Sequence, residues 1–250
     1  MKKIFLYILA GSLCFSACKK DDDPQTFVEP DDVAVRNTYD DQAIQKFLND
    51  NYLDTQGNIK AFSATDTIDD HEKKLAELNP IKLPSGVVYI VRNGAQPSPA
   101  KTIGGTDVLK MMVRAGNYLA TNIDGTVSLT ISPVAPYLVN TINGGGSPIS
   151  DPMWYYVKNS VLNDPNVTGA AKERKYYEIE GLQEGLKYFK SYDDRPDGAA
   201  YNLQGVIIVP SRAAFARDAH YNYIGYSLQN RTFVFNFQVY DTKTRPTSQE

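Results

Sequence analysis

The chain has 250 residues, of which 22% are charged, and a formal net charge of −3 at neutral pH. This weakly acidic balance argues against a nucleic-acid-binding protein, because such proteins need clustered lysine and arginine. The two cysteines, Cys14 and Cys18, both lie near the amino terminus, so the rest of the chain contains no disulfide and no reactive thiol. A chain of this length can bury an adequate core without disulfides.

Residues 1–17 have the features of an export signal. Two lysines precede an apolar run over residues 4–15, and two small residues stand directly before Cys18. The run is shorter than the about 20 apolar residues that a membrane-spanning helix needs. Its end, Phe-Ser-Ala-Cys, resembles the bacterial lipobox, which implies cleavage before Cys18 and lipidation of that cysteine. The alternative is an ordinary secretory signal that ends near a cysteine.

Residues 18–39 are rich in Asp, Pro and Glu and have few large apolar side chains, which predicts a flexible tether. Its first part, Lys-Lys-Asp-Asp-Asp over residues 19–23, resembles the signal by which some Gram-negative bacteria send lipoproteins to the cell surface. The alternative is a charged, solvated linker. We therefore expect an outer-membrane lipoprotein, and both cell-surface exposure and the periplasmic face remain open.

Residues 40–82 predict a helical arm. Four apolar residues recur at helical spacing: Ile44, Phe47, Leu48 and Tyr52. Asp40 or Asp41 is the expected N-cap of this helix. A second short helix is expected over residues 67–78, where an Asn-Pro pair follows.

Residues 83–243 change to a strand-rich pattern and are expected to form one domain, followed by a tail at 244–250. The predicted strands are residues 87–91, 108–113, 126–131, 175–180, 205–209 and 232–240. Helices are expected over residues 151–162, with Asp151 as N-cap, and from Leu182 to Phe189. In the last strand apolar and mostly polar residues alternate, which predicts a half-buried antiparallel strand. The fold class is therefore α+β.

The sequence predicts no metal site and no cofactor. His71 and His220 have no partners at the spacing of zinc ligands. The glycines at 144–146 are not followed by the Lys-Ser/Thr pair of a phosphate-binding loop. The acidic stretch of Asp193, Asp194 and Asp197 is interpreted as a solvated loop, although paired carboxylates can serve acid–base chemistry.

Three segments resemble FKBP-type peptidyl-prolyl cis-trans isomerases. Residues 178–186, Glu-Ile-Glu-Gly-Leu-Gln-Glu-Gly-Leu, resemble the family's Val-Ile-x-Gly-Trp-x-Glu-Gly-Leu segment. Residues 206–216 resemble its Ile-Pro-x-x-Leu-Ala-Tyr-Gly stretch, and residues 232–239 resemble its terminal Leu-Val-Phe-Asp-Val-Glu-Leu strand. The resemblance covers residues 83–243, with an insertion at about 135–174, and implies an antiparallel sheet curled around a short helix.

The resemblance also implies a proline-binding pocket. Ile179 would lie at its floor and donate a backbone N–H, and Leu182 would replace the tryptophan at its base. Phe215 would stand in place of a tyrosine, and Phe235 would match a wall phenylalanine. Arg114 falls where another pocket tyrosine would lie. The alternative is that the four apolar residues, Ile179, Leu182, Phe215 and Phe235, are simply core residues.

Two functions follow from the resemblance. The first is a cell-envelope prolyl isomerase that assists the folding of exported proteins and needs no metal or nucleophile, because amide resonance alone creates the barrier to twisting. The second is a non-catalytic binding or structural lipoprotein that isomerises proline peptides poorly or not at all. The expected partners are proline-containing polypeptide segments or other envelope proteins, and the membrane through the lipid anchor.

Overall fold

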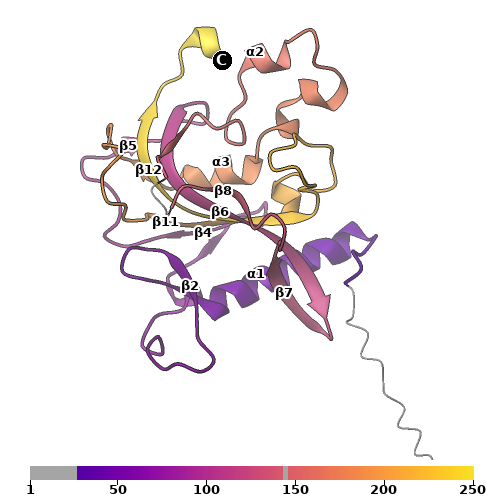
Figure 1. The fold of residues 1–250 in the computed structure, drawn as a ribbon, viewed down its shortest axis with the longest axis vertical. Coiled ribbons are helices and arrows are strands. Elements are labelled where there is room, and N and C mark those ends of the chain that lie inside the picture. Colours follow the sequence, from indigo (N-terminus) through magenta and orange to yellow (C-terminus); the bar gives the residue numbers. More distant parts are fainter. Residues whose placement is uncertain (1–26, 143–145) are drawn as a thin grey trace, which may run out of the picture.

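The computed structural model describes residues 27–142 and 146–250. Cys18, the leader and the first part of the expected tether lie outside the described residues. The described chain is α+β, with a curled antiparallel sheet and few helices (Figure 1). The α+β class and the antiparallel sheet predicted from the sequence are confirmed.

The main sheet has eight strands and all its pairings are antiparallel. Six lie in the order β3 (Ile81–Lys82), β4 (Val88–Val91), β11 (Gly205–Val209), β12 (Arg231–Lys243), β6 (Val108–Ile123) and β7 (Thr126–Ile131). The other two, β8 (Tyr137–Asn140) and β9 (Ile149–Ser150), also pair with β6. Two small sheets join β1 (Asn51–Leu53) to β2 (Ile59–Ala61) and β5 (Lys101–Thr102) to β10 (Lys190–Ser191).

The α-helices of the described chain are α1 (Val33–Asp50), α2 (Asn159–Leu162) and α3 (Glu180–Leu186). Short 3-10 helices cover Leu75–Glu77, Gly169–Lys172, Arg174–Tyr176, Ser211–Ala213 and Thr247–Gln249. Among the described residues, no helix has both the length and the apolar character needed to cross a membrane.

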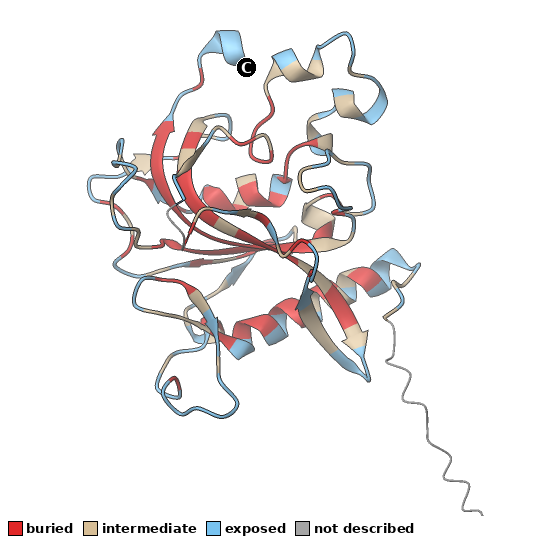
Figure 2. Ribbon diagram, in the orientation of Figure 1, coloured by how far each residue is buried: buried red, intermediate tan, exposed pale blue. Residues whose placement is uncertain are grey.

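The main sheet is buried on both faces. Figure 1 shows α3 in the hollow of the curled sheet and α1 on its other side. Alternate residues of β11 enter two clusters, because Ile207 and Val209 pack on the α3 side while Val206 and Ile208 pack on the α1 side. Strands β11 and β12 are accordingly buried along almost their whole length (Figure 2).

The expectation that the last strand is half-buried is wrong. From Thr232 to Thr242 every residue of β12 is buried, including Asn236 and Gln238. The Asn236 side-chain amide donates to the Gly57 carbonyl at 2.9 Å, and its oxygen accepts from the Ile59 N–H at 3.3 Å. The segment that follows α1 thus covers this face and satisfies its polar groups, so the predicted arm is part of the fold.

Helix α1 begins at Val33, earlier than predicted, so the expected tether ends before this residue and not at residue 39. Its N-cap is Asp32, whose side chain accepts from the Ala34 N–H at 2.7 Å, and not Asp40 or Asp41. Asp40 instead lies in the middle of the helix, fully buried, 2.9 Å from Arg36 Nη2. The tether was predicted over residues 18–39 because few large apolar side chains occur there, but Arg36 in this stretch pairs with Asp40 inside the protein.

Three further predicted elements differ. Residues 67–78 form turns and one 3-10 helix, and residues 175–180 form a 3-10 turn that leads into α3 in place of a strand. The helix expected over 151–162 is reduced to α2. Asp151 has φ +52°, which differs from the extended backbone of an N-cap, so no helix starts there.

Candidate functional site

The structure brings the four predicted pocket residues together in one cluster. Ile179 and Leu182 come from the start of α3, Phe235 from β12, and Phe215 from the loop after β11. Their exposed fractions are 0%, 0%, 2% and 0% for Ile179, Leu182, Phe215 and Phe235. These side chains therefore form packed core in this structure, and none of them faces solvent.

A segment of the insertion fills the space over this cluster. We call residues 151–157 the strap; it contains Trp154, the single tryptophan of the chain. The Trp154 ring lies 5.9 Å from the Phe235 ring, and its carbonyl accepts the Ile179 N–H at 2.8 Å. Two of the contacts that the resemblance implies for a bound proline segment, those at Ile179 and Phe235, are thus made by the protein's own Trp154.

The strap is fixed by hydrogen bonds from the segment that begins α3. The Gln183 side-chain amide donates to the Tyr155 carbonyl, and Glu178 Oε1 accepts the Val157 N–H at 2.8 Å. On the other side, the Tyr155 hydroxyl donates to the Gly104 carbonyl at 2.5 Å. Burial raises the pKa of this hydroxyl, which keeps it a donor. The strap main chain is therefore held at Trp154, Tyr155 and Val157.

Arginines hold the strap at Tyr156 and Asp151. The guanidinium carbons of Arg174 and Arg245 each lie 4.4 Å from the centre of the Tyr156 ring. Arg245 also forms a two-point ion pair with the Asp151 carboxylate. Burial raises the pKa of Asp151, but hydrogen bonds from Arg245 and Lys158 outweigh it and leave the pKa below the usual value. Arg245, although close to the carboxyl end of the chain, thus belongs to this site.

Phe215, the other aromatic residue of the predicted pocket, packs against further aromatic rings. Phe215 lies 5.0 Å from the His220 ring and 6.2 Å from the Phe233 ring. His220 Nε2 accepts the Leu228 N–H at 2.8 Å, so the neutral ring carries its proton on Nδ1, which lies 3.0 Å from the Tyr221 carbonyl oxygen. His220 therefore has a structural role at the end of the loop that carries Phe215.

Arg114 does not enter the predicted pocket. Its β6 neighbours Val113 and Ala115 belong to the cluster around α3, so Arg114, one residue on, points to the opposite face of the sheet. There it lies beside Tyr118 and Asn236. A shift of one residue along a strand moves a side chain to the opposite face of the sheet. The motif alignment did not determine the position of Arg114 to within one residue.

The acidic residues considered for acid–base chemistry are held by lysines. Lys101 Nζ lies 2.5 Å from Asp193, and Lys110 Nζ lies 2.5 Å from Asp197. Within residues 27–142 and 146–250, no group of three or more His, Cys, Asp or Glu side chains could hold a metal ion. This loop thus has the contacts of a surface ion-pair network.

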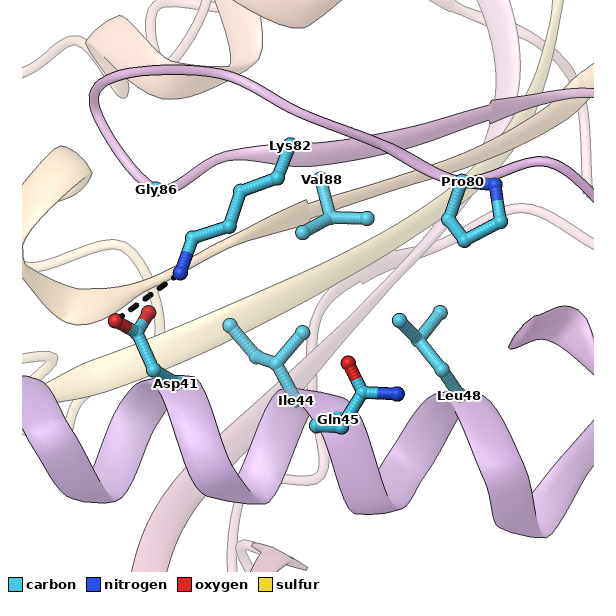
Figure 3. A pocket seen from close by; sticks show the side chains of 8 residues that line it. All are labelled: Asp41, Ile44, Gln45, Leu48, Pro80, Lys82, Gly86 and Val88. Carbon is cyan, nitrogen blue, oxygen red and sulfur yellow. Dashed lines mark ion pairs between the residues drawn. The ribbon is translucent and has the colours of Figure 1, made fainter.

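Two of the hollows in the described surface lie beside α1 and α3. One, of about 120 Å³, lies between α1 and the β3–β4 hairpin, where Ile44, Leu48 and Val88 line it and an Asp41–Lys82 ion pair of 3.1 Å closes one end (Figure 3). The other is a shallow groove of about 760 Å³ beside α3. Its charged lining is three glutamates and three basic residues: Glu178, Glu180, Glu184, Arg174, Lys187 and Arg212. The first hollow holds about one side chain, and the second has no net charge that would select an ion.

No family model matches the chain, and no curated protein sequence matches it. Among solved structures, the chain is similar to FkpA from Escherichia coli, an FKBP-type prolyl isomerase, with 21% identity and a TM-score of 0.35. The match covers 67% of this chain and 53% of FkpA, so the chain spans about half the length of this neighbour. A match at this score establishes neither a shared fold nor a shared activity.

Proposed function

We propose that this protein is an FKBP-like lipoprotein of the cell envelope that binds partner proteins without isomerising proline. The three sequence segments that resemble the family, together with the antiparallel sheet curled around α3, support the FKBP-like fold. The main observation against catalysis is that the Ile179 N–H, which would bind the proline segment, already donates a hydrogen bond to the Trp154 carbonyl.

The energetics of the strap support the same proposal. A prolyl isomerase must admit an X-Pro segment and bind its twisted amide more tightly than its planar form. Here the incoming segment would have to displace Trp154, which is 4% exposed. Removing a buried tryptophan from its contacts costs about 3–5 kcal/mol, before the ion pairs and hydrogen bonds of the strap are broken.

The proposal places the protein at the outer membrane, anchored by lipid on Cys18. Residues 19–23 support display on the cell surface. Partners would be other envelope proteins or their proline-containing segments, which would contact the exposed surface beside α3, where a groove of about 760 Å³ lies. Exposed tyrosines suit such contacts, and Tyr188 and Tyr226 are 48% and 52% exposed.

A protease-free assay on a fluorescent X-Pro peptide tests the absence of catalysis. We expect the wild type to leave the uncatalysed rate unchanged. Because Trp154 is the single tryptophan, its emission reports on the strap, and we expect no spectral change on adding the peptide. Turnover equal to that of an active family member, with a shift of Trp154 emission, would establish the isomerase function instead.

A further inference from the structure

The main sheet ends at two edges that differ in kind. At one end β3 has only two residues, one of them Lys82, and Pro80 precedes it. Short length, lysine and proline are the features that prevent edge strands from pairing with other chains. At the other end β7 (Thr126–Ile131) has six residues, Thr-Val-Ser-Leu-Thr-Ile, with no charge and no proline.

The outer edge of β7 has unpaired main-chain groups. The β6–β7 turn has two residues, Asp124 and Gly125, both with positive φ, so Ile123 and Thr126 form the first hydrogen-bonded pair. Counting along the register, residues 127, 129 and 131 direct their N–H and C=O groups away from β6. Across the described ranges, no hydrogen bond joins the β7 main chain to anything except β6.

Apolar side chains are exposed around the same edge. Ile131 on β7 is 38% exposed, and Ile123 at the end of β6 is 43% exposed. In the chain that continues from β7, Val134 and Tyr137 are 63% and 37% exposed. An open edge and exposed apolar side chains thus coincide at the rim of the sheet, where Figure 1 shows β7.

We propose that β7 pairs with β7 of a second copy of this chain, antiparallel and about a two-fold axis. Outward-directed residues must face each other, and the register that uses most of the strand places Leu129 on the axis. Val127 then lies opposite Ile131 of the second copy, and Ser128 lies opposite its Thr130. Apolar residues meet apolar residues and hydroxyls meet hydroxyls, the kinds of cross-strand pair that stabilise sheets.

The composition of β7 selects a second copy over a foreign strand. A charged edge would repel its own copy and favour a partner of opposite charge. Because β7 carries no charge, an identical strand meets no repulsion, and nothing on the edge selects an unlike partner. The dimer would leave α3, the strap and the groove beside α3 free, since these lie on other parts of the sheet.

Disulfide cross-linking tests the register. The full chain carries Cys14→Ser and Cys18→Ser, so that one introduced cysteine is the only thiol, and is purified in mild detergent. Leu129→Cys lies on the axis and should form a dimer of twice 27.8 kDa on oxidation. The control Thr126→Cys lies on the same strand but about 20 Å from its copy in this register, and should not cross-link.

Sedimentation equilibrium of the same chain without an introduced cysteine tests the edge itself. Ile131→Lys places lysine on the edge and should weaken dimerisation by about tenfold or more. Ile81→Lys makes the same change at a similarly exposed residue of β3, at the opposite end of the sheet, and should leave the dimer intact. A monomeric chain, or equal cross-linking at 126 and 129, would overturn the proposal. A monomer that binds an unrelated extended peptide at β7 would assign the edge to that other occupant.

Discussion

Asp40 and Arg36 are the buried ion pair on which the contact between α1 and the sheet depends. Asp40 accepts hydrogen bonds from Arg36 Nη2 at 2.9 Å and from the Ser211 backbone N–H at 2.8 Å, and Arg36 Nη1 donates to the Ala120 carbonyl at 2.6 Å. Arg36 is 1% exposed and Asp40 is 0% exposed. The pair therefore joins the amino-terminal helix to two distant parts of the chain.

Asp40→Ala should lower the free energy of unfolding by about 3–5 kcal/mol, because it leaves the buried Arg36 guanidinium with only the Glu29 carboxylate, 3.6 Å away. The matched control is Asp50→Ala, which removes an exposed i,i+4 pair with Lys46 on the same helix and should cost about 0.5 kcal/mol or less. Urea denaturation measures both. Equal losses would mean that the buried pair contributes no more than a surface pair.

The ion pair of Asp151 should make the stability of the folded protein depend on pH. The folded-state pKa of Asp151 lies below the unfolded value of 3.8, so its charge stabilises the fold above that pH. The contribution is lost as the pH falls from about 4 through the folded-state pKa. Denaturation of the wild type and Asp151→Asn should show a stability difference at pH 7 that shrinks below pH 3.8. A difference that is constant down to pH 2 would contradict the pairing with Arg245.

At the scale of elements, the glycines of the segment at residues 178–186 have a clear packing role in α3. Its two glycines, Gly181 and Gly185, are four residues apart and face the sheet. A Cβ on Gly181 would lie 2.6 Å from a Val209 methyl and 2.9 Å from the Ala213 carbonyl oxygen, and one on Gly185 would lie 2.8 Å from an Ile207 methyl. The glycines therefore set the close approach of α3 to β11.

Gly181→Ala should destabilise the protein by about 1–3 kcal/mol, even though alanine favours helices, because the added methyl overpacks the contact with β11. Gly105→Ala is the control, since a Cβ there meets nothing within 4 Å. Thermal unfolding measures both changes. A stabilised Gly181→Ala variant would show that helix propensity dominates and that the contact can relax.

The same scale explains which elements the sequence could predict. The strands that became β4, β7, β11 and β12 were predictable, because β-branched and aromatic residues and turn glycines mark them locally. The strap was predicted wrongly as part of a helix over residues 151–162, because the local sequence does not show that it is fixed by Arg174, Gln183 and Arg245. The motif assigned Ile179 and Leu182 to one pocket, with Ile179 on an expected strand and Leu182 on the helix, but could not reveal that Trp154 fills the space over them.

At the scale of the whole molecule, the described residues form one folded body in which α1 covers the sheet. The described chain reaches extended residues 27–32 before the helix starts, and Arg217 donates to the carbonyls of Pro30 and Asp31. The stretch available as a tether from Cys18 is therefore shorter than the sequence suggested. A folded domain that begins about ten residues after its lipid would lie close to the membrane surface.

Lipidation of Cys18 is the prediction on which this arrangement depends. Cells that make the full chain are labelled with a fatty-acid analogue, and the protein is recovered and compared with Cys18→Ala. The wild type should carry label and Cys18→Ala should not, because Cys18 is the residue proposed to carry the acyl chains of the anchor.

The matched control is Cys14→Ala, which removes the other cysteine of the leader and should keep the label. Label that persists in Cys18→Ala would contradict acylation of this residue, and a wild type without label would indicate a secreted domain. Loss of label in Cys14→Ala alone would place the acylated residue four positions earlier and leave cleavage before Cys18 without support.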